Sequence, residues 1–152
     1  MNIVIVGDGK VGYTLAEYLS KEEHDVTLVD RNQQALDKAT ETLDVMGVKG
    51  NGANVRTLLE AGVDTADILI AVTTHDETNM VCCLAAKQLG VKYTIARIRD
   101  PEYTESMSLL QNGMGIDLVV NPERATAMEI SRLLRFPFAT NIEAFAHGRV
   151  EM

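Results

Sequence analysis

Short apolar runs alternate along the chain with longer segments in which apolar residues recur every three or four positions. The short runs are typical of buried strands, and the longer spacing is typical of amphipathic helices. Six strands are predicted, at Asn2–Val6, Asp25–Val29, Asp44–Lys49, Ile68–Val72, Tyr93–Ile98 and Leu118–Val120. Helices are predicted between and after them, at Lys10–Lys21, Asn32–Thr42, Asn54–Ala61, Glu77–Leu89, Glu102–Asn112 and Pro122–Leu134.

This alternation predicts an α/β fold, a Rossmann-like doubly wound sheet of six parallel strands with helices on both faces. Right-handed crossovers place the ligand crevice of such a sheet outside the carboxyl ends of the strands, where the strand order reverses. Residues that directly follow a strand are therefore the first candidates for ligand contact.

The first predicted strand runs into a glycine motif, G-x-G-x-x-G, from Gly7 to Gly12. Gly7 permits a tight turn, Gly9 lets phosphate oxygens approach the backbone, and Gly12 allows the following helix to pack against the sheet. The amino end of that helix offers unpaired N–H donors to a pyrophosphate. The alternative is a strand turn with incidental glycines.

An acidic residue, Asp30, ends the second apolar run and follows Gly12 at close to the spacing of about 20 residues expected for an acid that binds ribose hydroxyls. Its carboxylate would lie against a 2′-phosphate, so the site is predicted to prefer NAD, or another unphosphorylated adenosine ribose, over NADP. The neighbouring Arg31 would favour a 2′-phosphate, which leaves this preference open.

Polar side chains also follow the later strands. Asn51 lies between two glycines and is expected to close over the adenosine, while Thr73 and Thr74 are expected to meet the ribose or phosphates. For Thr74 and Asp76, capping of the next helix is an equal alternative. Thr73 is better placed for a ligand.

Two arginines, Arg97 and Arg99, alternate with apolar residues at the end of the fifth strand, so one is expected in the crevice and the other toward solvent. Arg97 is the expected phosphate or ribose contact, with a surface ion pair as the alternative. Lys10, in the glycine loop, is either a partner for a terminal phosphate or solvated.

Composition narrows the class of protein. The 152 residues are 46% hydrophobic, enough for one domain with a sizeable core, and the formal net charge of −8 argues against broad nucleic-acid binding. Neither the adjacent Cys82 and Cys83 nor the scattered histidines have metal-ligand spacing, so no metal is expected. No apolar run approaches the roughly 18 residues of a membrane span and no leader precedes the first strand, so a reduced, cytoplasmic protein without direct membrane insertion is expected.

From Met1 to about Leu134 these motifs resemble the RCK/KTN family, the TrkA-type amino-terminal domain of Trk and Ktr potassium uptake regulators. The resemblance rests on the glycine motif and on Val29–Arg31, Gly50–Gly52, Ala71–Met80 and Ile95–Arg97. The discriminating part is the run Thr-x-x-Asp-Glu-x-Asn-Met that ends at Met80, because a generic dehydrogenase shares the glycine loop but need not carry that run.

The resemblance implies a non-enzymatic, cytoplasmic regulatory subunit that binds NAD or NADH, and also ATP or ADP. Such domains form dimers, assemble into larger rings below a membrane potassium transporter or channel subunit, and pass nucleotide-dependent motion to the ion pathway. By resemblance, binding roles fall on Gly7, Asp8, Gly9, Lys10, Val11, Asp30, Asn51, Thr73, Thr74 and Arg97. Glu123 resembles a position where some relatives hold a divalent ion, but one carboxylate does not define a cation site.

The nucleotide-binding domain is predicted over residues 1–134, followed by a linker at residues 135–152. The family continues with a carboxyl-terminal subdomain, so a chain that ends at Met152 is either cut before it or a short natural variant. The helix Pro122–Leu134, with Phe136 and Phe138, is expected to contact a partner subunit or, alternatively, to complete the cover of its own sheet.

A small NAD-dependent oxidoreductase is the alternative function. Such an enzyme needs an acid or base near the nicotinamide, and His75 is the only histidine near the predicted crevice.

Overall fold

The computed structural model describes residues 1–106, 111, 113–135, 144–145 and 150–151. The chain divides into two compact units, Met1–Val120 and Asn121–Met152. The expected boundary after residue 134 stays a prediction.

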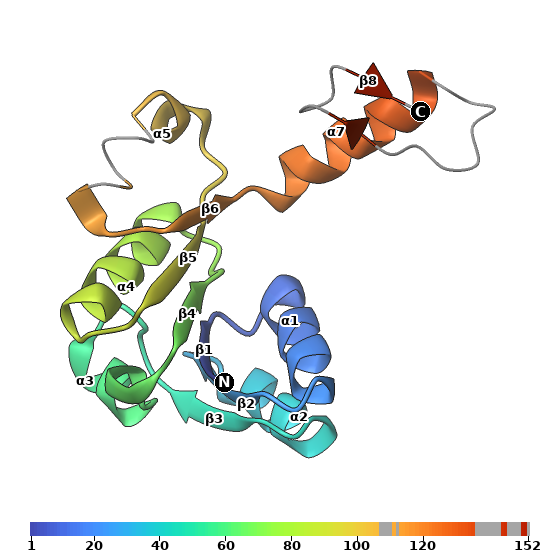
Figure 1. The fold of residues 1–152 in the computed structure, drawn as a ribbon. Helices are drawn as coiled ribbons and strands as arrows, with labels where there is room; N and C mark the ends of the chain where they lie inside the picture. The colour runs from blue at the N-terminus through green and yellow to red at the C-terminus, as the bar shows by residue number, and fades with distance from the viewer. Residues whose placement is uncertain (107–110, 112, 136–143, 146–149, 152) are drawn as a thin grey trace. The chain divides into compact units, whose positions relative to one another are not determined.

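The first unit is built on a sheet of six parallel strands. They are β1 (Asn2–Val6), β2 (Asp25–Asp30), β3 (Met46–Lys49), β4 (Ile68–Ala71), β5 (Tyr93–Arg97) and β6 (Leu118–Val120). Their spatial order is β3-β2-β1-β4-β5-β6 (Figure 1). This doubly wound order reverses between β1 and β4 and confirms the predicted Rossmann-like fold.

The helices of this unit are α1 (Lys10–Lys21), α2 (Gln33–Thr42), α3 (Val55–Glu60), α4 (Asp76–Gln88) and α5 (Pro101–Glu105), with a short 3-10 turn, η1 (Val63–Thr65). Helix α1 matches its prediction in full. Helices α2 and α3 begin one residue later than predicted, because Asn32 and Asn54 serve as N-caps whose side-chain oxygens accept N–H bonds from the first turn.

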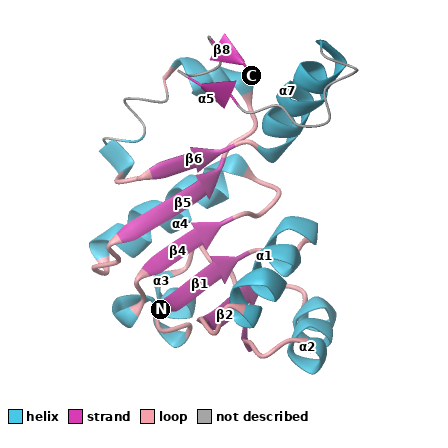
Figure 2. Ribbon diagram, turned by 45° about the vertical axis from the view of Figure 1, so that its right-hand side comes forward, coloured by secondary structure: helices cyan, strands magenta, loops and turns pink. Residues whose placement is uncertain are grey.

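The helices cover both faces of the sheet, with α1 and α2 on one side and α3 and α4 on the other (Figures 1 and 2). Alternate residues of β1 point to opposite faces of the sheet and pack into the buried cluster on each face, as the pleat of a strand requires. Ile3 and Ile5 pack into one buried cluster, which includes Leu36 of α2. Val4 and Val6 pack into the other, with residues of α3 and α4.

Other predicted boundaries also differ from the structure. Strand β3 begins at Met46 rather than Asp44, because the chain bends there and the N–H of Val45 bonds to the carbonyl of Leu43 at 3.0 Å. Strands β4 and β5 each end one residue early. The predicted helix Glu102–Asn112 is wrong at Ser106, where a turn follows α5; serine is a weak helix former. Residues 107–110 and 112 of that helix lie outside the described residues.

The second unit contains α7 (Pro122–Arg135) and an antiparallel pair of short strands, β7 (Ala144–Phe145) and β8 (Val150–Glu151). Helix α7 confirms the predicted helix and begins where the side chain of Asn121 accepts the N–H of Arg124 at 2.9 Å. Phe136 and Phe138, the expected aromatic anchors, lie outside the described residues.

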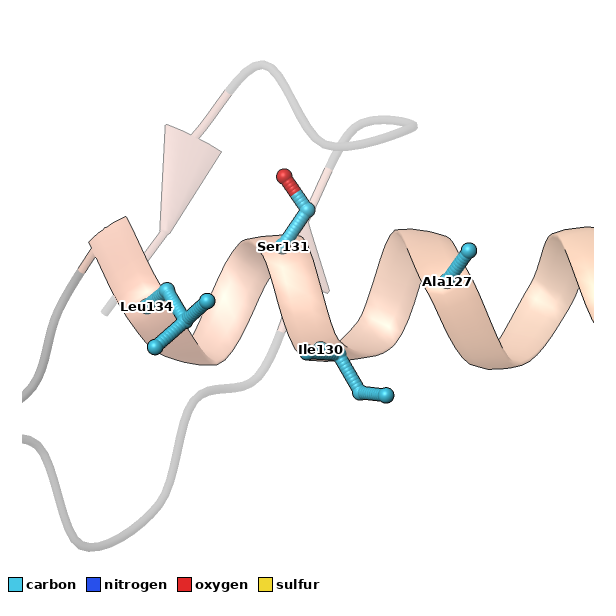
Figure 3. A pocket seen from close by; sticks show the side chains of 4 residues that line it. All are labelled: Ala127, Ile130, Ser131 and Leu134. Atoms are coloured by element: carbon cyan, nitrogen blue, oxygen red, sulfur yellow. The ribbon is translucent and has the colours of Figure 1, made fainter.

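Helix α7 carries large apolar side chains that are exposed to solvent: Met128, Ile130, Leu133 and Leu134. Figure 3 shows Ala127, Ile130, Ser131 and Leu134 along the helix, where they line a pocket. In the described part of the chain, no helix combines the length and the apolar character that a membrane crossing requires.

Candidate functional site

The site lies at the carboxyl edge of the sheet, beside the point where the strand order reverses. Strands β1 and β4 pair in parallel there, up to Val6 and Ala71. The glycine loop after β1 thus lies beside the loop after β4, and ligands of doubly wound sheets bind at this point.

The three glycines of the motif have different surroundings. Gly7 has a φ of +104°, and an added Cβ would lie 2.9 Å from the backbone nitrogen of Thr73. At Gly12 an added Cβ would lie 1.8 Å from the carbonyl oxygen of Gly7. Gly9 is open, since an added Cβ would meet nothing within 4 Å. The first and third glycines therefore permit close packing, while Gly9 leaves space over the loop.

The amino end of α1 differs from those of its neighbours. Its N-cap is Gly9, which makes no side-chain capping bond, and its first turn contains no acid. By contrast, α2 and α3 are capped by asparagines, and α4 has two acids in its first turn. The N–H groups that open α1 have no intrahelical acceptor, so this end presents donors and partial positive charge to an anion.

The first two side chains of α1, Lys10 and Val11, differ in burial. Lys10 is exposed, as a phosphate partner or a solvated lysine would be. Val11 is partly buried against the core cluster of β1 and α2. A contact between Val11 and a ligand would therefore run through its backbone N–H.

Asp30 lies at the end of β2 and holds two backbone segments. One carboxylate oxygen accepts the N–H of Asp8 at 2.7 Å, and the other accepts the N–H of Asn32 at 2.8 Å. These bonds fix the acid beside the glycine loop, as the sequence predicted. Arg31, the next residue, is exposed.

Asp8 has an environment that the sequence did not indicate. Both of its carboxylate oxygens are buried and have no hydrogen-bond partner among the described residues. Burial raises the pKa of Asp8, the nearby carboxylate of Asp30 raises it further, and Lys38 opposes the shift. Buried ionisable groups with perturbed pKa values cluster at functional sites.

The turn after β3 is tied to the same edge. The N–H of Gly50 donates to the carbonyl of Asp30 at 2.9 Å, and the side-chain oxygen of Asn51 accepts the N–H of Ala53 at 3.2 Å. Gly52 packs against β1, because an added Cβ would lie 2.2 Å from a methyl of Val6. The turn places Asn51 near the acid, as an adenosine contact would require.

The hydroxyl of Thr73 is already engaged within the protein. It lies 2.7 Å from the side-chain oxygen of Asn79, to which it donates, and accepts the N–H of His75 at 3.3 Å. Thr74 is exposed, and its hydroxyl lies 3.1 Å from a ring nitrogen of His75. The N-cap of α4 is His75 and makes no side-chain capping bond, so the alternative in which Thr74 or Asp76 caps this helix is wrong.

Asp76 instead binds the segment after β5. Its buried carboxylate accepts the N–H groups of Arg99 at 2.7 Å and Asp100 at 2.8 Å. The Nε of Arg99 lies 3.7 Å from the same carboxylate, so Arg99 forms an ion pair with Asp76. The two alternatives for Arg97, a ligand contact or a surface ion pair, stay predictions. Arg97 is half-buried at the end of β5, where its carbonyl accepts the side-chain N–H of Asn79 at 2.8 Å.

Sequence reasoning gave Asn79 no role, and it considered Asp76 as a possible helix cap rather than as a partner of the segment after β5. Both belong to the discriminating run, and their signal was a polar residue every third position, from Thr73 through Asp76 to Asn79. That spacing places Asp76 and Asn79 on one face of α4. Among the residues that the structure describes, no three His, Cys, Asp or Glu side chains gather as a metal site would need.

A family model described as "TrkA-N domain" matches residues 3–122. The "Trk system potassium uptake protein TrkA homolog" of Archaeoglobus fulgidus is 40% identical over 152 residues, which is 100% of this chain and 34% of the relative. The chain thus spans about a third of the length of such curated relatives.

Two solved structures share the fold. "Crystal structure of the GsuK bound to ADP" is 27% identical with a TM-score of 0.73, and the match covers 90% of this chain and 34% of that one. "GsuK channel bound to NAD" is 24% identical with a TM-score of 0.66, covering 78% of this chain and 21% of that one.

Proposed function

Because this chain belongs to the TrkA-N domain family, we propose that it is the nucleotide-sensing part of a regulatory subunit of a potassium uptake system. The observation that carries the proposal is the uncapped amino end of α1 beside the carboxylate of Asp30. Such an arrangement offers donors to a pyrophosphate and acceptors to a ribose diol. NAD and ADP share both features.

The proposed ligand is NAD or NADH, with ATP or ADP as competing nucleotides. The GsuK structures bound to ADP and to NAD support this ligand class. The proposed contacts in this chain are Gly7, Asp8, Gly9, Lys10, Val11, Gly12, Asp30, Arg31, Asn51, Thr73, Thr74 and Arg97. The open space over Gly9 and the exposure of Lys10 favour the phosphate contacts in particular.

The proposed partner is a Trk- or Ktr-type potassium transporter subunit in the membrane, which the chain regulates from the cytoplasmic face. The names of the curated relatives describe potassium uptake rather than catalysis, so the oxidoreductase alternative is not proposed. In this proposal, exchange of one nucleotide for another changes the conformation of the assembly, and that change gates the membrane subunit.

The assembly is proposed to be a homo-oligomer, a dimer or a tetramer, with α7 as a contact surface. Its exposed Leu134 and Met128 are 72% and 64% accessible in the single chain. Burial of such side chains against a second copy would be favourable. The double change Met128→Glu and Leu134→Glu should then lower the mass measured by light scattering, while Thr126→Glu on the same helix should not. An unchanged mass in the double variant would show that α7 is not part of the interface.

The proposed function is tested by calorimetric titration with NAD, NADH, ATP and ADP in parallel, with light scattering on the same samples. Adenosine, which has the ribose but no phosphate, is the control ligand. At least one nucleotide should bind more tightly than adenosine, and two nucleotides should give different masses or shapes. Absence of binding by all four would contradict the proposal, and steady oxidation of NADH would restore the enzyme alternative.

A further inference from the structure

Asn79 is a polar side chain that is fully buried and fully hydrogen-bonded, with 0% exposure. Its oxygen accepts the backbone N–H of Thr73 at 2.9 Å and the hydroxyl of Thr73 at 2.7 Å. Its nitrogen donates to the carbonyl of Thr73 at 3.2 Å and to the carbonyl of Arg97 at 2.8 Å. One amide thus joins the residues that follow β4 and end β5.

These bonds determine which hydrogen bonds the hydroxyl of Thr73 can still form with a ligand. A hydroxyl has one proton and two lone pairs. The proton is held by Asn79, with the carbonyl of His75 at 3.2 Å as the other acceptor within reach. The N–H of His75 occupies one lone pair. Thr73 therefore has no donor for a phosphate oxygen, and its remaining lone pair can accept from a ligand hydroxyl.

The position of Thr73 indicates which hydroxyl that is. Thr73 packs against Gly7, across the glycine loop from Asp30. In the proposed function, Asp30 takes the adenosine ribose and the amino end of α1 takes the pyrophosphate. A dinucleotide bound across the switch point continues past the pyrophosphate toward β4, where its second ribose lies.

We propose that Asn79 is a positioning residue that presents Thr73 as a hydrogen-bond acceptor to the second ribose of a dinucleotide. The inference rests on the proposed nucleotide site and adds a basis for selectivity. NAD and ADP-ribose carry the second ribose, whereas ADP does not. Thr73 then separates dinucleotides from adenine mononucleotides, while the glycine loop and Asp30 bind both.

The test compares the affinities of ADP-ribose and ADP, because these two ligands differ in the second ribose and not in the adenosine diphosphate. Three variants are titrated by calorimetry beside the unchanged protein. Thr73→Val removes the acceptor, Asn79→Leu removes the amide, and Thr73→Ser keeps the hydroxyl whose proton Asn79 accepts. Thr94→Val is the matched control, since Thr94 is also 0% exposed but bonds to Gly115 and Asp117 at the opposite edge of the sheet.

Thr73→Val and Asn79→Leu should each lower the preference for ADP-ribose over ADP about fivefold, the ratio expected for one hydrogen bond worth about 1 kcal/mol. Thr73→Ser should keep most of the preference, and Thr94→Val should keep it despite lower thermal stability. If Asn79→Leu does not fold, Thr73→Val and Thr73→Ser decide. If Thr73→Val still binds ADP and keeps the same preference for ADP-ribose over ADP, the inference is wrong. If the unchanged protein binds none of these nucleotides, the proposed function is wrong instead.

Discussion

The backbone N–H of Asp8 donates to the carboxylate of Asp30 at 2.7 Å, which joins the glycine loop to the acid at the end of β2. The other carboxylate oxygen holds the N–H of Asn32, at the start of α2. Asp30 therefore organises the ribose side of the proposed site before any ligand binds. Each oxygen also retains acceptor capacity for a ribose hydroxyl.

Replacing this acid tests the ribose contact. Asp30→Asn should weaken NAD and ADP binding by about 1–3 kcal/mol, the range for a hydrogen bond to a charged group or for a buried partner left unsatisfied. Asp25→Asn, at the exposed opposite end of the same strand, should leave affinity unchanged. Calorimetry measures both variants, and equal affinities would place the ribose elsewhere.

A substitution at Gly9 can change nucleotide binding without lowering the stability of the fold. Gly9 has a φ of −81°, which alanine also adopts, and an added Cβ would meet nothing within 4 Å. Gly9→Ala should therefore keep or raise the stability, by up to about 1 kcal/mol, while its methyl obstructs the approach of a phosphate and weakens binding. Gly113→Ala, whose added Cβ is equally unobstructed, is the control. Thermal melts and calorimetry together check the prediction, which fails if nucleotide affinity is retained.

The buried carboxylate of Asp8 predicts a pH dependence of folding. Because burial and Asp30 raise its pKa in the folded state, Asp8 binds its proton more tightly in the folded protein than in the unfolded chain. The contribution of Asp8 to stability should therefore fall as the pH rises from the ordinary value of 3.8 through the raised pKa. Asp8→Asn should remove this fall and increase stability at neutral pH by up to about 1 kcal/mol.

Urea unfolding of Asp8→Asn and the unchanged protein from pH 3 to pH 8 measures this effect. The difference in free energy of unfolding between the two proteins should shrink toward low pH, where Asp8 is protonated in both the folded and the unfolded state of the unchanged protein. A constant difference across that range would mean that the charge of Asp8 is not responsible.

The adjacent cysteines predict slow thiol chemistry in the folded state. Burial raises the pKa of Cys82 and of Cys83 to about 12, and both are 0% exposed. Since the thiolate is the reactive form, alkylation at pH 8 should be slower than in the unfolded chain by about three orders of magnitude. Iodoacetamide labelling followed by mass spectrometry, with and without denaturant, measures both rates. Rapid native labelling would show that α4 opens locally.

The sequence was sufficient for the parts of the fold that local pattern controls. Apolar runs and helical spacing predicted β1, α1 and β6 to the residue, because buried strands and amphipathic helices leave a periodic pattern. The spacing from Gly12 to Asp30 predicted the acid beside the loop, since a βαβ unit places the end of its second strand next to the loop that follows its first. The end of the fifth helix was missed, because one turn residue such as Ser106 carries little local signal.

Only the tertiary structure decided how the polar side chains at this edge are used. Sequence reasoning treated Thr73 as open to a ligand and Asp76 as a possible helix cap, because both types of residue serve both purposes. The parallel pairing of β4 with β5 brings Arg97 and Arg99 within reach of the first turns of α4, so Asn79 and Asp76 bind backbone groups across the two loops. The sequence by itself determined the fold and the glycine–acid pair; hydrogen bonds between distant segments, which no local pattern encodes, determined which donors and acceptors remain for a ligand.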